Sequence, residues 1–135
     1  MKFLVRFCAL FALIFSTYAL TDEQKEKLNV YSKECKTQSG VTQDLIERGR
    51  NGELVDDLTL KKQIVCVMKK IGMATASGEL DVEYIRNRLK KVSGDDEEVE
   101  RIIKKCVVTR DTPEQTAFEV SKCLLEQKPK FSPVD

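Results

Sequence analysis

The stretch DLTLKKQIVCVMKKIG, residues 57–72, contains the signals that decide the fold of this chain of 135 residues. Asp56 or Asp57 is suited to cap the start of a helix, and Gly72 is suited to end it at the C′ position. The lysines provide a solvent-facing side, and the apolar residues follow a helical pattern at Leu58, Ile64, Val65, Val67, Met68 and Ile71. The stretch therefore predicts an amphipathic helix over residues 58–71 that carries a cysteine, Cys66.

Two helices are predicted on the N-terminal side of this stretch. TDEQ, residues 21–24, fits a capping box, in which the first and last side chains satisfy each other's backbone amides, and Gly40 ends the helix that follows. Thr42 is suited to cap a second, shorter helix. We expect Gly49 and Gly52 to stop that short helix.

Three more helices are predicted on the C-terminal side. Residues 73–78 form a loop of small residues without a period, after which Asp81 caps a fourth helix. The acidic run DDEE, residues 95–98, opens a fifth helix, where the helix dipole favours negative charge. TPEQ, residues 112–115, is a second capping box and opens a sixth helix that runs to about Gln127. No segment alternates as a strand does, so we predict an all-α domain of about six short helices.

The first 19 residues predict a secretory signal peptide. A basic start is followed by an apolar run, residues 7–15, and by small residues that suit a cut after Ala19. The run is shorter than the about 20 residues that span a bilayer, so a retained anchor fits less well. We expect a secreted, extracellular protein with one domain, residues 20–135, whose residues 128–135 form an extended tail.

Composition excludes several function classes. Removing 19 residues from 135 leaves 116, with 21 basic and 22 acidic side chains, so no basic face for nucleic acid is indicated. The chain has no histidine, which removes the usual nucleophile–base pairs and histidine metal ligands. The acidic run at residues 95–98 lacks the spacing of a calcium loop. We therefore expect no enzyme activity, no cofactor, no metal and no insertion into a membrane.

Cysteine spacing predicts two disulfides. Cleavage after Ala19 removes Cys8 and leaves an even number of cysteines, as is typical of a secreted domain. Four cysteines allow three pairings, among which the sequence alone does not choose. Chain breaks at residues 111–113 favour one pair between the fifth and sixth helices, which leaves a second pair between the first and third. No pair has the close spacing of a redox motif, so we interpret the cysteines as structural, at Cys35, Cys66, Cys106 and Cys123.

Helical periodicity does not distinguish a solid core from a hollow one. A solid core is the simpler interpretation of the apolar faces. Two features favour an interior that accepts a ligand. Met68 and Met73 are adaptable side chains, and Tyr31, Tyr84 and Ser121 carry hydroxyl groups that need partners where they are buried.

The order of helices and cysteines, together with TDEQKEKL at residues 21–28 and TPEQTAFE at residues 112–119, resembles the insect odorant-binding proteins, the pheromone and general-odorant-binding family. The resemblance covers the whole mature chain and is to the four-cysteine "minus-C" branch, since the second and fifth cysteines of the usual six fall at Lys62 and Glu114. It implies the pairs Cys35–Cys66 and Cys106–Cys123 and an internal apolar cavity.

The resemblance implies a secreted carrier of small hydrophobic molecules such as odorants, pheromones or other apolar semiochemicals. Two alternatives stay open: a disulfide-stapled interaction protein with a solid core, and a non-olfactory carrier of lipids or other hydrophobic molecules in haemolymph or gland fluid. A membrane receptor and a second copy of the chain are further candidate partners. The residues that we expect to line the cavity are Tyr31, Val65, Met68, Met73, Tyr84, Ile85, Leu89, Ile103, Val107, Phe118, Ser121 and Leu125.

The missing bridge is the main departure from the family pattern. Lys62 and Glu114 are candidates for an ion pair in its place, which would stabilise an exposed site by only about 0–1 kcal/mol. We therefore expect a more pliable cavity than in relatives with six cysteines. The tail could cover the cavity or extend away from it.

Overall fold

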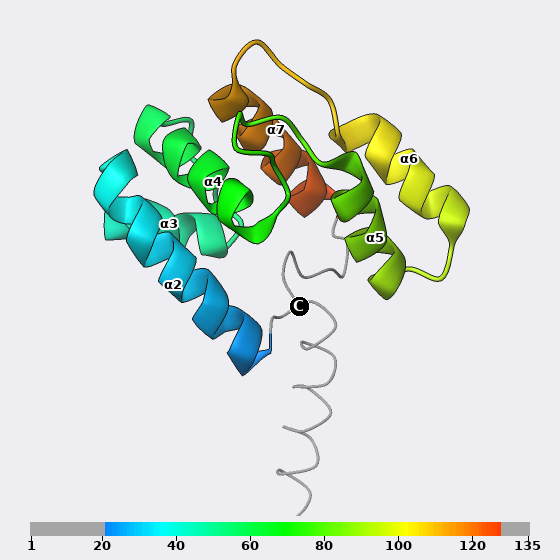
Figure 1. Cartoon of the computed structure of the whole chain (residues 1–135), viewed down its shortest axis with the longest axis horizontal. Helices are drawn as coiled ribbons and strands as arrows, with labels where there is room; N and C mark the ends of the chain where they lie inside the picture. The colour runs from blue at the N-terminus through cyan, green and yellow to red at the C-terminus, as the bar shows by residue number, and fades with distance from the viewer. Residues whose placement is uncertain (1–20, 128–135) are drawn as a thin grey trace, which may run out of the picture.

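The computed structural model describes residues 21–127, which fold into helices (Figure 1). The predicted signal peptide and the predicted tail lie outside these residues. The only bridge between extended segments that the described part contains joins Ala74 to Leu80. The prediction of an all-α domain with six helices is confirmed, and the helices are α2 (Asp22–Ser39), α3 (Gln43–Arg50), α4 (Leu58–Ile71), α5 (Val82–Val92), α6 (Asp96–Cys106) and α7 (Pro113–Glu126).

Local capping explains where the helices begin and end. The Thr21 hydroxyl accepts from the Gln24 amide at 3.2 Å, and the Gln24 side chain accepts from the Thr21 amide at 2.9 Å, so the first capping box is confirmed. Gly40 and Gly72 follow α2 and α4 in the left-handed conformation, with φ of 75° and 94°. Glycine adopts this conformation at no steric cost. These bounds match the predicted ones.

Two predicted details were wrong. Gly49 lies inside α3, which continues to Arg50 before the Asn51 cap. A lone glycine costs only about 1 kcal/mol in a helix, so it does not have to end one. The second capping box is one-sided. Thr112 accepts from the Gln115 amide at 3.1 Å, but the Gln115 side-chain oxygen accepts from Lys61 Nζ at 2.8 Å.

The helices pack in a series that differs from their order in the chain. Helix α2 packs on α4, α4 on α7, α7 on α6, and α6 on α5. Figure 1 shows α2, α3 and α4 on one side, α5 and α6 on the other, and α7 between them. Within the described residues, no comparably extensive contact joins the two ends of the series, α2 and α5. A separate small cluster, Val41, Ile46 and Leu60, holds α3 against α4.

Two disulfides lock this series. Cys35–Cys66 joins α2 to α4 with the Cα atoms 5.8 Å apart, and Cys106–Cys123 joins α6 to α7 with the Cα atoms 5.3 Å apart. The pairing implied by the family resemblance is confirmed. In the chain-entropy model each bridge stabilises the fold by about 3–4 kcal/mol.

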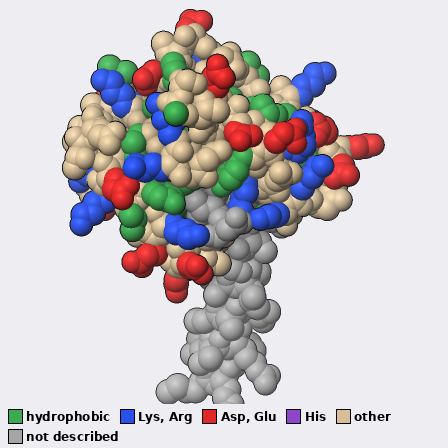
Figure 2. Space-filling model, viewed as in Figure 1, with side chains coloured by type: hydrophobic (Ala, Val, Ile, Leu, Met, Phe, Trp, Pro, Cys, Tyr) green, Lys and Arg blue, Asp and Glu red, His purple; other side chains and the backbone are tan. Residues whose placement is uncertain are grey.

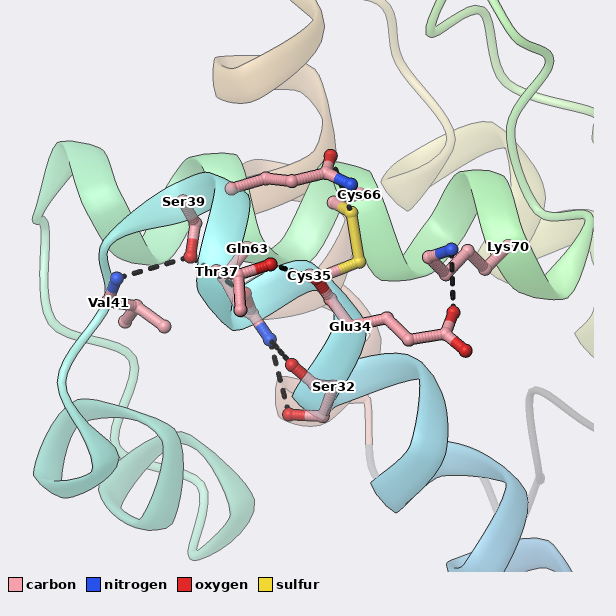
Figure 3. The surroundings of a disulfide bond; sticks show 10 residues. Ser32, Glu34, Cys35, Thr37, Ser39, Val41, Gln63, Cys66 and Lys70 are labelled. Carbon is pink, nitrogen blue, oxygen red and sulfur yellow. Dashed lines mark hydrogen bonds and ion pairs between the residues drawn. A yellow bond between two sulfur atoms is a disulfide. The ribbon is translucent and has the colours of Figure 1, made fainter.

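A buried glutamine strengthens the contact between α2 and α4 beside the first disulfide (Figure 3). Gln63 is 4% exposed; its oxygen accepts from the Ser39 hydroxyl at 2.8 Å, and its nitrogen donates to the Ser32 carbonyl at 2.8 Å. Lys70 and Glu34 form an ion pair on the same helix pair at 2.8 Å. The first disulfide is therefore one of several contacts that fix α2 on α4.

The contact between α4 and α7 depends on Lys61. Lys62 is exposed and forms no ion pair with Glu114 in the part of the chain that the structure describes. The neighbouring Lys61 ammonium donates to Gln115 at 2.8 Å and lies 5.1 Å from the Phe118 ring centroid. A polar contact thus joins the helices next to the positions that the third bridge would occupy.

The segment between α4 and α5 folds back on itself and against α7. The Asp81 amide donates to the Met73 carbonyl at 2.8 Å, and the Thr75 amide donates to the Glu79 carbonyl at 2.7 Å. Gly78, with φ of 90°, lies so close to Pro113 that an added Cβ would be 2.6 Å from the proline Cβ. This fold-back places Met73 against the interior. None of the described helices is both long enough and apolar enough to cross a membrane.

Candidate ligand-binding site

One large apolar cluster occupies the interior between α4, α5, α6 and α7. Ile85, Val99 and Val120 are fully buried in it, and Leu89 is 1% exposed. Each of these helices contributes because its apolar residues recur at helical spacing and face the same interior. The buried members of the cluster are Val65, Met68, Met73, Ala74, Ile85, Leu89, Val99, Ile102, Ile103, Cys106, Ala117, Val120 and Leu124.

The cluster brings together eight of the twelve residues predicted to line a cavity. Six are buried members, and two more, Tyr84 and Val107, are partly buried and pack against it. The eight come from three helices, the loop after α4 and the cap of α6, so residues far apart in the sequence meet here. They are Val65, Met68, Met73, Tyr84, Ile85, Leu89, Ile103 and Val107.

The other four predicted residues lie outside the cluster. Phe118 is 3% exposed, but its ring lies beneath the Lys61 ammonium at the contact between α4 and α7. Tyr31 and Ser121 are partly buried, and Leu125 is 47% exposed on α7. Tyr31 is separated from the cluster because α2 packs on α4 and contributes no member.

The sequence analysis did not predict one buried charged residue, Arg88. Arg88 on α5 is 6% exposed, whereas the other described lysines and arginines are partly or fully exposed. It follows Ile85 by three positions and Tyr84 by four, which places the three residues on one helix face. That spacing is the signal in the sequence that points to the burial of Arg88.

The carboxyl groups with clearly shifted pKa values lie on the surface, away from the cluster. A hydrogen bond from Arg86, at 2.7 Å, lowers the pKa of Glu100 and joins α5 to α6. The Thr59 hydroxyl and the Leu60 amide lower the pKa of Asp57 at the start of α4. These groups stabilise helix ends and contacts, and none of them faces the apolar interior.

The arrangement of the described residues suits the binding of a small apolar molecule. The described residues hold no cluster of three histidine, cysteine or carboxylate side chains that could bind a metal ion. Acidic and basic side chains are interspersed over the face shown in Figure 2, without a large region of one sign. What the interior offers is apolar surface with the Tyr84 side chain packed against it. Such a mixture, mostly apolar with few polar groups, is typical of small-molecule sites.

Comparisons with known proteins agree with this geometry. Residues 17–127 match the model of the PBP/GOBP family. The B1 protein of Tenebrio molitor is 48% identical over 119 residues, which are 88% of this chain and 92% of the relative.

Two solved structures are similar in fold to this chain. THP12, a carrier protein from the yellow meal worm, is 36% identical with a TM-score of 0.56, covering 69% of this chain and 86% of that chain. The fatty acid binding protein OBP56a from the oral disk of the blowfly Phormia regina is 26% identical with a TM-score of 0.64, covering 82% of this chain and 95% of that one.

Proposed function

The chain belongs to the PBP/GOBP family, whose members carry small hydrophobic molecules, and we propose that it binds its ligand at the apolar cluster between α4, α5, α6 and α7. The observation that carries this proposal is the convergence of four helices and the segment after α4 on one apolar interior. Met68 and Met73 give this interior two adaptable side chains. Tyr84, partly buried at its edge, offers a hydroxyl for orientation.

The energetics are adequate for a weak to moderate carrier. Burial of apolar surface contributes about 25 cal/mol per Å². A ligand that buries about 400 Å² would gain about 10 kcal/mol before the costs of ordering are subtracted. Micromolar affinity needs about 8 kcal/mol, so apolar burial supplies most of it.

Secretion is part of the proposal. Members of this family are secreted soluble proteins, and the basic and apolar start of this chain supports the same route. The expected mature chain begins at Leu20. Mass spectrometry of the protein secreted by insect cells tests this start, and a mass that includes residues 1–19 would contradict it.

The names of two structural relatives favour a carrier that is not restricted to odour detection. One is called a carrier protein, and the other a fatty acid binding protein from an oral disk. We therefore keep the non-olfactory carrier as a second candidate. Localising the transcript distinguishes the two, because an olfactory carrier is expected in antennal tissue and the other in gland or body fluid.

Displacement of a fluorescent apolar probe tests the proposed function. Mature protein is titrated with N-phenyl-1-naphthylamine, and the bound probe is then displaced by aliphatic alcohols, aldehydes and esters. We expect saturable micromolar binding and displacement. Folded protein without displaceable binding would contradict the proposal and favour an interaction protein with a solid core.

Two matched leucine variants test the location of the site. Leu89 is 1% exposed within the cluster and Leu125 is 47% exposed, so Leu89→Ala and Leu125→Ala remove the same atoms from different environments. We expect Leu89→Ala to weaken probe binding by about tenfold through lost apolar contact, and Leu125→Ala to leave it unchanged. Circular dichroism confirms that both variants fold. Equal affinities in the two folded variants would place the site elsewhere.

A further inference from the structure

Arg88 is the one charged side chain that the described part of the chain buries. It is 6% exposed, next to Leu89 in sequence and three positions after Ile85, and those two are 1% and 0% exposed in the apolar cluster. Residues at this spacing share one face of a helix. The Arg88 side chain therefore leaves α5 on the side that meets the interior. Burying a charge is costly unless hydrogen-bonding partners compensate for lost water.

Two other partly buried cations of the fold join helices. Lys61 is held by Gln115 and Asp56 at the contact between α4 and α7, at 2.8 and 2.6 Å. Arg86 pairs with Glu83 and, at 2.7 Å, with Glu100 on α6. Both of these cations join helices near the surface. Arg88 differs because its neighbours on α5 are members of the apolar cluster.

Two polar residues of α5 lie on the same face as Arg88. Tyr84, four positions earlier, packs against the cluster with its ring about 3.5 Å from where a Cβ of Gly72 would lie. Lys91, three positions later, is exposed and adds positive charge at the edge. Each of the three residues already takes part in an interaction within the chain. A bound group would therefore join or replace those interactions.

We propose that Arg88 and Tyr84 form a headgroup site for an aliphatic carboxylate whose alkyl chain enters the apolar cluster. The proposal rests on the carrier function proposed above and names the ligand class. The planar guanidinium can donate two parallel hydrogen bonds to both carboxylate oxygens, and the phenol can donate a third. Low polarity around the site strengthens these charge-assisted bonds relative to water. A neutral alcohol of equal length fills the same apolar space but gains only one weak bond at Arg88.

The test compares dodecanoate with dodecan-1-ol as competitors of N-phenyl-1-naphthylamine at pH 7, below the concentration at which dodecanoate forms micelles. Wild-type protein is expected to bind dodecanoate at least about tenfold more tightly than dodecan-1-ol. Arg88→Met should reduce this preference to within about twofold, because dodecanoate loses far more affinity than dodecan-1-ol does. Lys90→Met, which removes a charge from the exposed side of α5, should keep the wild-type preference.

The outcomes separate this inference from the carrier function. Wild-type protein that binds the alcohol as tightly as the carboxylate would overturn the headgroup site and leave the carrier function intact. Protein that binds neither competitor nor probe would overturn the carrier function itself. A preference that persists in Arg88→Met would overturn the assignment to Arg88.

Two further measurements test the proposal if the Arg88→Met variant does not fold. Arg88→Lys keeps the charge but loses the planar pair of donors, so it should lower the preference for dodecanoate by several-fold. In wild-type protein, dodecanoate should shift the Arg88 Nε resonance in a saturable manner, and dodecan-1-ol should shift it much less. Equal shifts with both competitors would contradict the proposal.

Discussion

The Lys61 side chain makes three contacts that no neighbouring lysine makes. Its ammonium donates to Gln115 at 2.8 Å, pairs with Asp56 at 2.6 Å and lies 5.1 Å from the Phe118 ring centroid, and its side chain is 14% exposed. Asp56 is largely exposed, so the ion pair contributes little. The hydrogen bond to Gln115 and the contact with the ring carry most of the stabilisation.

Replacing Lys61 should therefore destabilise the fold. We expect Lys61→Met to lower the free energy of unfolding by about 1–2 kcal/mol, because the Gln115 oxygen loses its charged donor. The control is Lys62→Met, an exposed lysine in the next position, which should change stability by less than about 0.5 kcal/mol. Urea unfolding measures both variants. Equal stabilities would show that the Lys61 contacts do not replace the missing bridge.

Gly78 and Gly52 provide a second matched pair. Both have φ of 90°, but an added Cβ at Gly78 would lie 2.6 Å from Pro113 Cβ, whereas nothing lies within 4 Å at Gly52. We expect Gly52→Ala to cost about 1 kcal/mol from backbone strain alone. Gly78→Ala should cost about 1–3 kcal/mol more, because the loop must move away from α7. Thermal unfolding of the two variants checks this, and equal losses would contradict the close approach.

At the scale of the helix, sequence signals worked where they act within one turn. Thr21, Thr42, Asp81 and Thr112 each accept from an amide three residues ahead, so their caps depend on adjacent sequence. The third helix was predicted with both of its observed ends, since Asp57 and Gly72 flank it. Local hydrogen bonds of this kind are visible in a sequence because they need no distant partner.

Local sequence signals did not predict hydrogen bonds whose partner is distant in the sequence. The Gln115 side chain has two competing donors, the Thr112 amide nearby and Lys61, which is 54 residues away, and it accepts from Lys61. Nothing in the local pattern TPEQ reveals the distant lysine. Gly49 was expected to stop α3, but its helix runs one residue further because a glycine weakens a helix without ending it.

The stability contributed by the start of α4 should also depend on pH. The Asp57 carboxylate accepts from the Thr59 hydroxyl and the Leu60 amide, and these bonds lower its pKa in the folded chain. Glu53 and Glu100 also have lowered pKa values, each because of a hydrogen bond from an arginine. The unfolded chain therefore binds protons more readily, and the stability that these groups add above about pH 4 is lost as the pH falls below it.

Asp57→Asn tests the share of this effect that belongs to Asp57. The amide oxygen can still accept from Leu60, but the group no longer titrates. We expect the free energy of unfolding to fall less steeply between about pH 4 and pH 2 in Asp57→Asn than in the wild type. Exposed Asp111→Asn is the control and should keep the wild-type slope. Parallel urea titrations across this range measure the difference, and identical slopes for Asp57→Asn and wild type would contradict the assignment.

At the scale of the whole molecule, the helical period predicted well which residues are buried. It predicted less well which residues contact one another. Eight of the twelve predicted lining residues join one cluster, because α4, α5, α6 and α7 turn their apolar faces toward one interior. Tyr31 does not join it, because its helix, α2, packs on α4 and contributes no residue to the cluster. Arg88, on α5, is buried despite its charge. A period fixes a face of a helix, and only the packing of helices decides what that face contacts.

The absence of histidine has a consequence for ligand release. Carboxylates titrate mainly below pH 5, and no histidine in the chain changes charge between pH 7 and pH 5. We expect the affinity for a neutral ligand to change by less than about threefold over this range. Probe titrations at pH 7, 6 and 5 check this, with dodecan-1-ol as the competitor. A clear loss of affinity centred near pH 6 would contradict it.

The central claim is that a small hydrophobic molecule binds against the cluster, and methionine methyl NMR tests it most directly. The chain has three methionines, and the cleavage after Ala19 that we propose would leave only Met68 and Met73, both buried in the cluster. Protein labelled with ¹³C at the methionine methyl groups is titrated with dodecan-1-ol. We predict saturable shifts of both methyl signals at micromolar ligand. Methyl signals that stay unchanged at saturating ligand would contradict binding at this cluster.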